Sequence, residues 1–200
     1  PGTYKGDIYL ENLEGVTIRS ADPVARAVIQ GGSRGMQLAG PTDVTIYSLV
    51  FSRSQKNGLI IADASRDKPA RRIRLENLAV RDIVEKGNND GIKLTGVQDV
   101  IIRNVVVENW GTDGSGIDFV GVHRAMIEGS FLRHPGIGDG GTGIRVKGGS
   151  KAITIRANRV ELAAGKGRAI QAGGHTSTEY FRFADGDRGY DHRCRGCGTE

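Results

Sequence analysis

The chain has 200 residues, a length that suits one domain with a core of its own. Its hydrophobic content of 38% excludes a disordered chain, and no run of about 18 apolar residues predicts a membrane-spanning helix. The formal net charge of +5 permits binding to polyanions, but the arginines are scattered and aromatic residues make up only 6%, so the pattern of a nucleic-acid-binding protein is absent.

A short apolar segment opened by a glycine recurs along the chain. In chain order these openings are GMQL, GLII, GIKL, GIDF, GIRV and AIQA, at residues 35–38, 58–61, 91–94, 116–119, 143–146 and 169–172. A second apolar block follows the first five openings, at residues 43–51, 72–80, 99–107, 124–132 and 152–160. An earlier copy of this block, GVTIRSA, stands at residues 15–21.

The spacing of the repeat predicts its architecture. A period of about 20 to 30 residues is typical of a solenoid. Within each period the apolar residues alternate at every second position, which predicts strands and not helices. We expect three short strands per turn, each paired in parallel with its equivalent about 4.8 Å along the axis. A single turn cannot bury its apolar face, so neighbouring turns must do so.

This repeat resembles the right-handed parallel β-helix of pectate-lyase-like proteins over residues 1 to about 175. The resemblance implies an all-β, single-stranded solenoid of about six to seven coils. A β-sandwich or barrel of short strands is the alternative, although neither repeats its sequence at a fixed period. The sequence begins with PGTY, within the repeat pattern and without an initiating Met. We therefore expect a piece of a longer protein that lacks its native caps and any leader.

The sequence predicts one β-helix domain at residues 1–192 and an irregular tail at 193–200. The repeat calls for another apolar strand after residue 191, but HRCRGCGTE has no alternation. Its lone pair of cysteines, Cys194 and Cys197, falls short of the four ligands of a structural zinc and lacks the helix start of a redox CxxC. A truncation or a shifted reading frame near His192 would also explain the break.

The period of two places one row of side chains on the outer face. If Ile92 and Leu94 point inward, Lys93 between them points outward. The equivalent row reads Gln37, Ile60, Lys93, Asp118, Arg145 and Gln171, and the next outward row contains Lys147. We therefore expect Lys93, Asp118, Arg145 and Lys147 to share one face on consecutive turns. Their alternating charge fits either a working groove or an ion-pair ladder on a solvated face.

Polar loops enter this same face. They carry Asn89 and Asp90 in one loop, Trp110 and Asp113 in the next, and His134 in a third. We predict Trp110 to be an exposed platform for a sugar ring, and Asn89, Asp90, Asp113, Asp118 and Lys147 to contact substrate, because functional residues often lie on loops over a rigid scaffold. No metal site is predicted and no cofactor is required, although the loop aspartates could bind calcium.

The resemblance adds a chemistry. β-Helix proteins of this kind include polysaccharide lyases, hydrolases and epimerases, most of them secreted or periplasmic. For a polyuronate lyase it implies that Arg145 or Lys147 neutralises the uronate carboxylate while Lys93 or His134 abstracts the neighbouring proton. No signature of one lyase family is present. Two functions therefore stay open, a lyase on acidic polysaccharide and a non-catalytic glycan-binding or surface-scaffold β-helix. An intracellular polyanion-binding protein is a third and weaker alternative.

Overall fold

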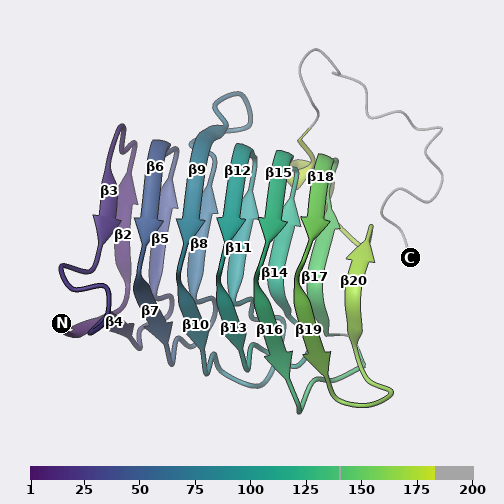
Figure 1. The fold of residues 1–200 in the computed structure, drawn as a ribbon. Coiled ribbons are helices and arrows are strands. Elements are labelled where there is room, and N and C mark those ends of the chain that lie inside the picture. The colour runs from purple at the N-terminus through teal and green to yellow at the C-terminus, as the bar shows by residue number, and fades with distance from the viewer. Residues whose placement is uncertain (140, 183–200) are drawn as a thin grey trace.

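The computed structural model describes residues 1–139 and 141–182. Figure 1 shows a row of stacked turns, coloured from purple at the first turn to yellow at the last. Each turn gives one strand to each of three sheets, and every pairing between named strands is parallel. Two sheets have seven strands and the third has six, so the predicted all-β solenoid of six to seven coils is confirmed.

Sheet A contains β1 (Gly2–Lys5), β4 (Ala27–Gln30), β7 (Leu49–Ser52), β10 (Ala79–Arg81), β13 (Val106–Glu108), β16 (Phe131–His134) and β19 (Arg159–Leu162). Sheet B contains β2 (Ile8–Glu11), β5 (Met36–Ala39), β8 (Leu59–Ala62), β11 (Ile92–Thr95), β14 (Ser115–Val120), β17 (Thr142–Lys147) and β20 (Arg168–Ala172). Sheet C contains β3 (Thr17–Arg19), β6 (Thr42–Tyr47), β9 (Ala70–Glu76), β12 (Val97–Arg103), β15 (His123–Glu128) and β18 (Lys151–Arg156).

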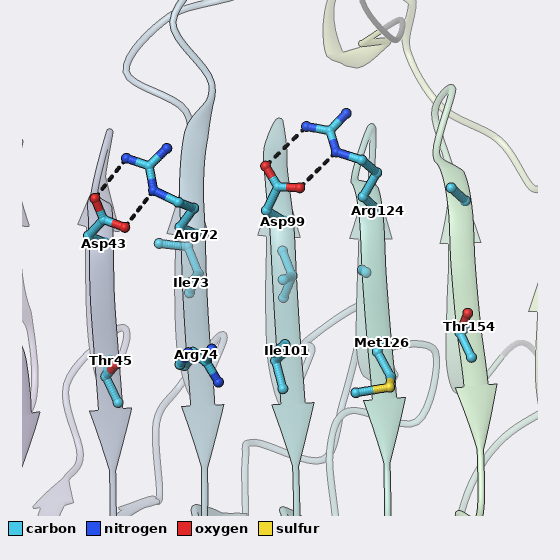
Figure 2. A pocket seen from close by; sticks show the side chains of 13 residues that line it. Asp43, Thr45, Arg72, Ile73, Arg74, Asp99, Ile101, Arg124, Met126 and Thr154 are labelled. Carbon is cyan, nitrogen blue, oxygen red and sulfur yellow. Dashed lines mark hydrogen bonds and ion pairs between the residues drawn. The ribbon is translucent and has the colours of Figure 1, made fainter.

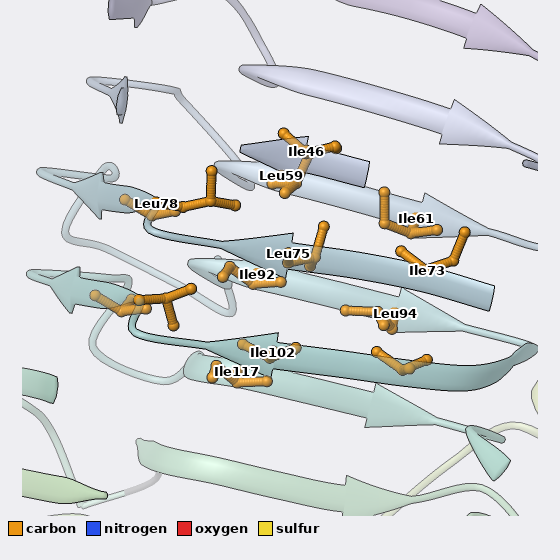
Figure 3. Close-up of a cluster of buried hydrophobic side chains, with 14 of the residues drawn as sticks. Ile46, Leu59, Ile61, Ile73, Leu75, Leu78, Ile92, Leu94, Ile102 and Ile117 are labelled. Carbon is orange, nitrogen blue, oxygen red and sulfur yellow. The ribbon is translucent and has the colours of Figure 1, made fainter. Parts of the chain in front are cut away.

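The core is a set of apolar columns that run along the axis. One column on sheet C stacks Ile46, Leu75 and Ile102, and one on sheet B stacks Leu59 and Ile92; all five side chains are fully buried (Figure 3). Burying an aliphatic side chain of this size contributes roughly 1.5–3 kcal/mol. Because each side chain packs on its equivalents in adjacent turns, the core fixes the register of the whole coil.

The repeated glycine at the start of the strands β5, β8, β11, β14 and β17 of sheet B has a steric cause. A Cβ atom at Gly91 would lie 2.7 Å from the carbonyl oxygen of Gly116, and a Cβ at Gly116 would lie 2.8 Å from that of Gly143. The backbones of successive turns therefore approach too closely for any side chain. Ala169 takes the last place in this column, at the edge strand β20, where no further described strand lies against it.

The corner between sheets C and A is made by one residue per turn in the left-handed conformation. Asn77 and Asn104 hold this position with φ angles of 54° and 52°, and Gly129 follows with 59°. Asparagine and glycine adopt this conformation at low energetic cost, and Ser48 and Ala157 hold the equivalent position in two other turns with φ angles of 55° and 52°.

After β20 the chain turns back along the corner between sheets B and C. Arg182 ends this return: its Nε donates to Asp63 Oδ2 over 2.6 Å, and its backbone N–H donates to the carbonyl of Gly148. A short 3-10 helix, η1 (Thr178–Tyr180), lies within it. In the described part of the chain, no helix has the length and apolar character needed to cross a bilayer. The predicted tail at 193–200, with both cysteines, lies outside the described residues.

Candidate functional site

The predicted outward row on sheet B is confirmed. Lys93 pairs in register with Asp118 of the next strand, and Asp118 pairs with Arg145 of the strand after that. Val120 pairs with Lys147, so Lys147 lies in the adjacent outward row. Side chains 25 to 54 residues apart in the chain therefore become neighbours on one face, because the turns stack in register.

Lys93 lies at the centre of a closed ion-pair cluster. Its ammonium donates to Asp90 Oδ2 at 2.9 Å and to Asp118 Oδ2 at 2.8 Å, and Lys147 Nζ lies 3.9 Å from Asp118 Oδ1. Both carboxylates are 1% exposed. Asp90 Oδ1 also accepts the backbone N–H of Ser115, which ties the cluster to the next strand. This arrangement matches the ladder interpretation more closely than that of an open groove.

The electrostatics argue against Lys93 as a base. Burial by itself would lower the pKa of Lys93, but the charges of Asp90 and Asp118, with their hydrogen bonds, outweigh it and raise the pKa well above its usual value. A proton-abstracting lysine at neutral pH needs the opposite shift. Burial, followed by the charge of Asp118, raises the pKa of Asp90. The role of general base predicted for Lys93 is therefore not supported.

Lys147 differs from Lys93 in its surroundings. Its side chain is 12% exposed, and burial lowers its pKa against the attraction of Asp118. On the same strand, Arg145 donates from Nη2 to Thr142 Oγ1 at 2.9 Å, and that hydroxyl donates to Gln171 Oε1 at 3.1 Å. Both basic groups are thus held within the sheet's own polar network, and the proposed capture of a uronate carboxylate remains a prediction.

The prediction that Trp110 is an exposed sugar platform is wrong. Trp110 is fully buried in the core, and its ring fills space beneath Gly116, whose added Cβ would lie 3.2 Å from it. His134 packs edge-on against the Trp110 ring with 4.9 Å between centroids, and its Nε2 lies 2.5 Å from the Trp110 carbonyl oxygen. His134 is 4% exposed, so its position gives no support to the prediction that it acts as a base on bound substrate.

The loop residues serve the loops themselves. The Asn89 side chain donates to the carbonyls of Val84 and Lys86, which closes its own loop, whereas Asp113 is exposed. Over the described residues, no three His, Cys, Asp or Glu side chains converge as a metal site. The calcium prediction also finds little support at Asp90, whose two oxygens are engaged by Lys93 and Ser115.

A second candidate surface lies on sheet C, where the sequence predicted none. It is an open trough of about 690 Å³ across the outer face of strands β6 to β18. We define the trough by two rows that follow the strand register. The first row is Asp43, Arg72, Asp99, Arg124 and Ala152, and the second is Thr45, Arg74, Ile101, Met126 and Thr154.

The first row of the trough consists of two ion pairs. Arg72 donates to both carboxylate oxygens of Asp43, with the shorter contact at 2.5 Å, and Arg124 contacts both oxygens of Asp99 at 2.7 and 3.0 Å (Figure 2). All four residues have positive φ angles between 53° and 58°, so each strand carries the same local bend. Side chains of this row are 41–53% exposed.

A signal for this row was present in the sequence. Each second block is opened by the residue in question, as in DVTIY, RIRLE, DVIIR and RAMIE, so Asp and Arg alternate at one slot of the repeat. The slot directly precedes the first inward residue of the block, so the period of two places it on the outer face. Only the register of sheet C shows that the four side chains align on one face.

The two faces differ in what they can bind. On sheet B the carboxylates are buried and already paired with lysine. A ligand that bound them would have to break the Lys93–Asp118 ion pair, which would leave a buried charge unpaired at a high cost in free energy. On sheet C the pairs are half exposed, and such pairs contribute only about 0–1 kcal/mol. Breaking such a pair to contact a polar ligand therefore costs little compared with breaking the buried cluster of sheet B.

A family model described as a right-handed beta helix region matches residues 11–180. No curated protein and no solved structure matches the chain. The matched segment begins at the last residue of β2 and ends in η1, so it covers the coil from β3 to β20. The parallel register of all three sheets agrees with this match. The chain therefore belongs to the right-handed β-helix family.

Proposed function

We propose that this β-helix binds an extended polysaccharide along the sheet C trough, as part of a secreted or periplasmic protein. The observation behind this proposal is the trough itself, which has a volume of about 690 Å³ and combines hydrogen-bond donors, acceptors and an apolar strip on one continuous face. It is a rigid surface: its side chains stand on paired strands and not on loops.

The chemistry of the trough suits hydroxyl groups. Carboxylates of Asp43 and Asp99 accept hydrogen bonds, and the guanidinium groups of Arg72 and Arg124 donate them. Hydrogen bonds to charged groups are stronger than those between neutral partners. Beside them, Ile101 and Met126 are half-buried and offer an apolar strip to the C–H face of a sugar ring.

Charge favours a neutral or weakly acidic polymer at this surface. Arginine exceeds aspartate by one among the trough residues, since Arg72, Arg74 and Arg124 face Asp43 and Asp99. The acidic polysaccharide expected from the net charge of +5 remains a partner to be tested. Catalysis as a lyase has less support, because the predicted base Lys93 is held protonated by two carboxylates.

Binding by the trough can be tested with a glycan panel and two matched double variants. Calorimetry would compare pectate, alginate, a glycosaminoglycan and neutral β-glucans. Asp99→Ala with Arg124→Ala removes one trough pair. Arg103→Ala with Glu128→Ala removes an ion pair of the same sheet outside the trough, together with the contact of Glu128 to Arg156. We expect at least a tenfold loss of affinity in the first variant and an unchanged affinity in the second.

Two results would contradict the proposal. One is the absence of binding to every glycan by a folded chain, and the other is an equal loss in both double variants. The same mixtures, followed by ultraviolet absorbance, report the unsaturated product of a lyase. New absorbance on pectate or alginate would show catalysis and would restore the lyase function.

A further inference from the structure

The ion pairs of the trough repeat every second turn. Asp43 and Arg72 lie on β6 and β9, and the next pair, Asp99 and Arg124, lies on β12 and β15. We infer that the trough takes a β-1,4-linked glycan in an extended two-fold ribbon, laid along the axis of the coil. This inference rests on the proposed function and names the class of polysaccharide.

The repeat distance follows from strand geometry. Asp43 and Asp99 occupy the same column of the register, two strands apart. Neighbouring strands are spaced by about 4.8 Å, so equivalent groups in the two pairs are spaced by about 9.6 Å along the axis. The column is straight because every strand bends at the same positive-φ residue (Figure 2).

A β-1,4-linked ribbon has a matching symmetry. Successive sugars are turned over relative to each other, so one edge of the ribbon presents the same hydroxyl groups at every second sugar. Each sugar of the ribbon advances the chain by a distance similar to the spacing between neighbouring strands, which is about 4.8 Å. Alternate turns of the trough likewise present the same group, an acceptor on one turn and a donor on the next. Chains of α-1,4-linked or β-1,3-linked glucose coil, and their hydroxyl groups leave the line of the column.

The second row of the trough supports a flat ligand. Ile101 and Met126 are adjacent across β12 and β15, two residues along each strand from the second ion pair. Thr45 and Arg74 hold the equivalent positions beside the first pair. A ribbon that places one edge on the ion pairs thus lies over an apolar half and a polar half, and the Met side chain adapts to the ring above it.

The column also sets the length of the site. By register, Gly15 precedes Asp43 in this column and Ala152 follows Arg124. Neither residue has a polar side chain, so the charged stretch covers four turns. At about one sugar per turn, the trough accommodates four sugars, and affinity should rise with chain length up to the tetrasaccharide and then level off.

The test uses oligosaccharides of two to six sugars that differ in linkage alone. Cello-oligosaccharides are β-1,4-linked glucose, laminari-oligosaccharides are β-1,3-linked glucose, and malto-oligosaccharides are α-1,4-linked glucose. β-1,4-linked manno- and chito-oligosaccharides cover other sugars of the same ribbon form. With the intact chain we expect at least one β-1,4 series to bind tenfold or more tightly than both other linkages, with a plateau at four sugars.

A double variant distinguishes a shortened binding site from a general loss of glycan affinity. Asp99→Ala with Arg124→Ala leaves only the first pair, and the plateau should then move from four sugars to two. Arg103→Ala with Glu128→Ala should keep the plateau at four. Circular dichroism melts confirm that each variant is folded, so that a loss of binding is not a loss of structure.

The outcomes distinguish the inference from the function beneath it. Equal affinity for all linkages, or preference for pectate over every β-1,4 series, with loss in the trough variant, overturns the ribbon inference and keeps the trough as a glycan site. Absence of a plateau change in the trough variant also overturns it. If no glycan binds, or if the trough variant binds as well as the intact chain, the proposed function fails with it.

Discussion

Lys93 on β11 and Asp118 on β14 stand directly opposite each other in the register, with 2.8 Å between Nζ and Oδ2. The same ammonium holds Asp90, and both carboxylates are buried. Opposite charges in this position serve the stacking of two turns. The contribution of these ion pairs to the free energy of unfolding can be measured, because removing one partner leaves the others buried and unpaired.

Lys93→Met should therefore destabilise the protein strongly. Two buried carboxylates, Asp90 and Asp118, would lose their shared cation, and breaking a buried pair costs about 3–5 kcal/mol. Chemical denaturation gives the change in the free energy of unfolding. Lys147→Met is the matched control on the same face, since burial already lowers the pKa of Lys147, and it should change stability by less than about 1 kcal/mol. Equal effects of the two changes would refute the closed cluster.

Trp110 provides a test of a core residue against a surface one. Because its side chain is fully buried, Trp110→Ala should cost about 3–5 kcal/mol of unfolding free energy. Trp110→Phe should cost less, since the indole N–H has no hydrogen-bond acceptor among the described residues. Thermal melts measure both changes. If the Trp110→Ala protein kept its melting temperature and lost only glycan affinity, the buried position of Trp110 would be contradicted.

His134 should make stability depend on pH. Burial lowers its pKa below the ordinary 6.5, so the unfolded chain takes up a proton at this residue before the folded chain does. The stabilisation is complete above about pH 6.5 and is lost as the pH falls toward the lower folded pKa. Denaturation at pH 7.5 and pH 5 measures the difference, which should shrink in His134→Gln. An unchanged pH dependence in that variant would contradict the assignment.

The glycine column predicts a contrast between two similar substitutions. Gly91→Ala places a methyl group 2.7 Å from the Gly116 carbonyl oxygen and 2.5 Å from Val107, and overpacking of this kind typically costs about 1–3 kcal/mol. Ala169→Gly, the reverse change at the edge of the same column, should cost at most about 1 kcal/mol. The unfolding free energies of the two variants test this contrast. If Gly91→Ala left the unfolding free energy unchanged, the turns would be less closely stacked than described.

Much of the fold followed from the repeat. Its period predicted the coil. The alternation around Lys93 predicted which side chains point outward and that they share one face of sheet B. The trough on sheet C did not follow, because the exposure of the Asp43–Arg72 pair depends on what packs around it in the stacked sheet, which the repeat alone does not give. The character of Trp110 was also missed, since a residue in a polar loop can turn inward where the next turn leaves space above it.

By itself, the sequence determined the stacking of turns, because apolar residues at fixed intervals and a glycine at each close approach leave few other ways to bury the core. What each face offers a ligand was decided only by the tertiary structure. The same alternation of acid and base gives buried, mutually neutralised charges on sheet B and half-exposed pairs on sheet C. The difference is one of burial, which sets the energy of an ion pair and depends on neighbours distant in the chain.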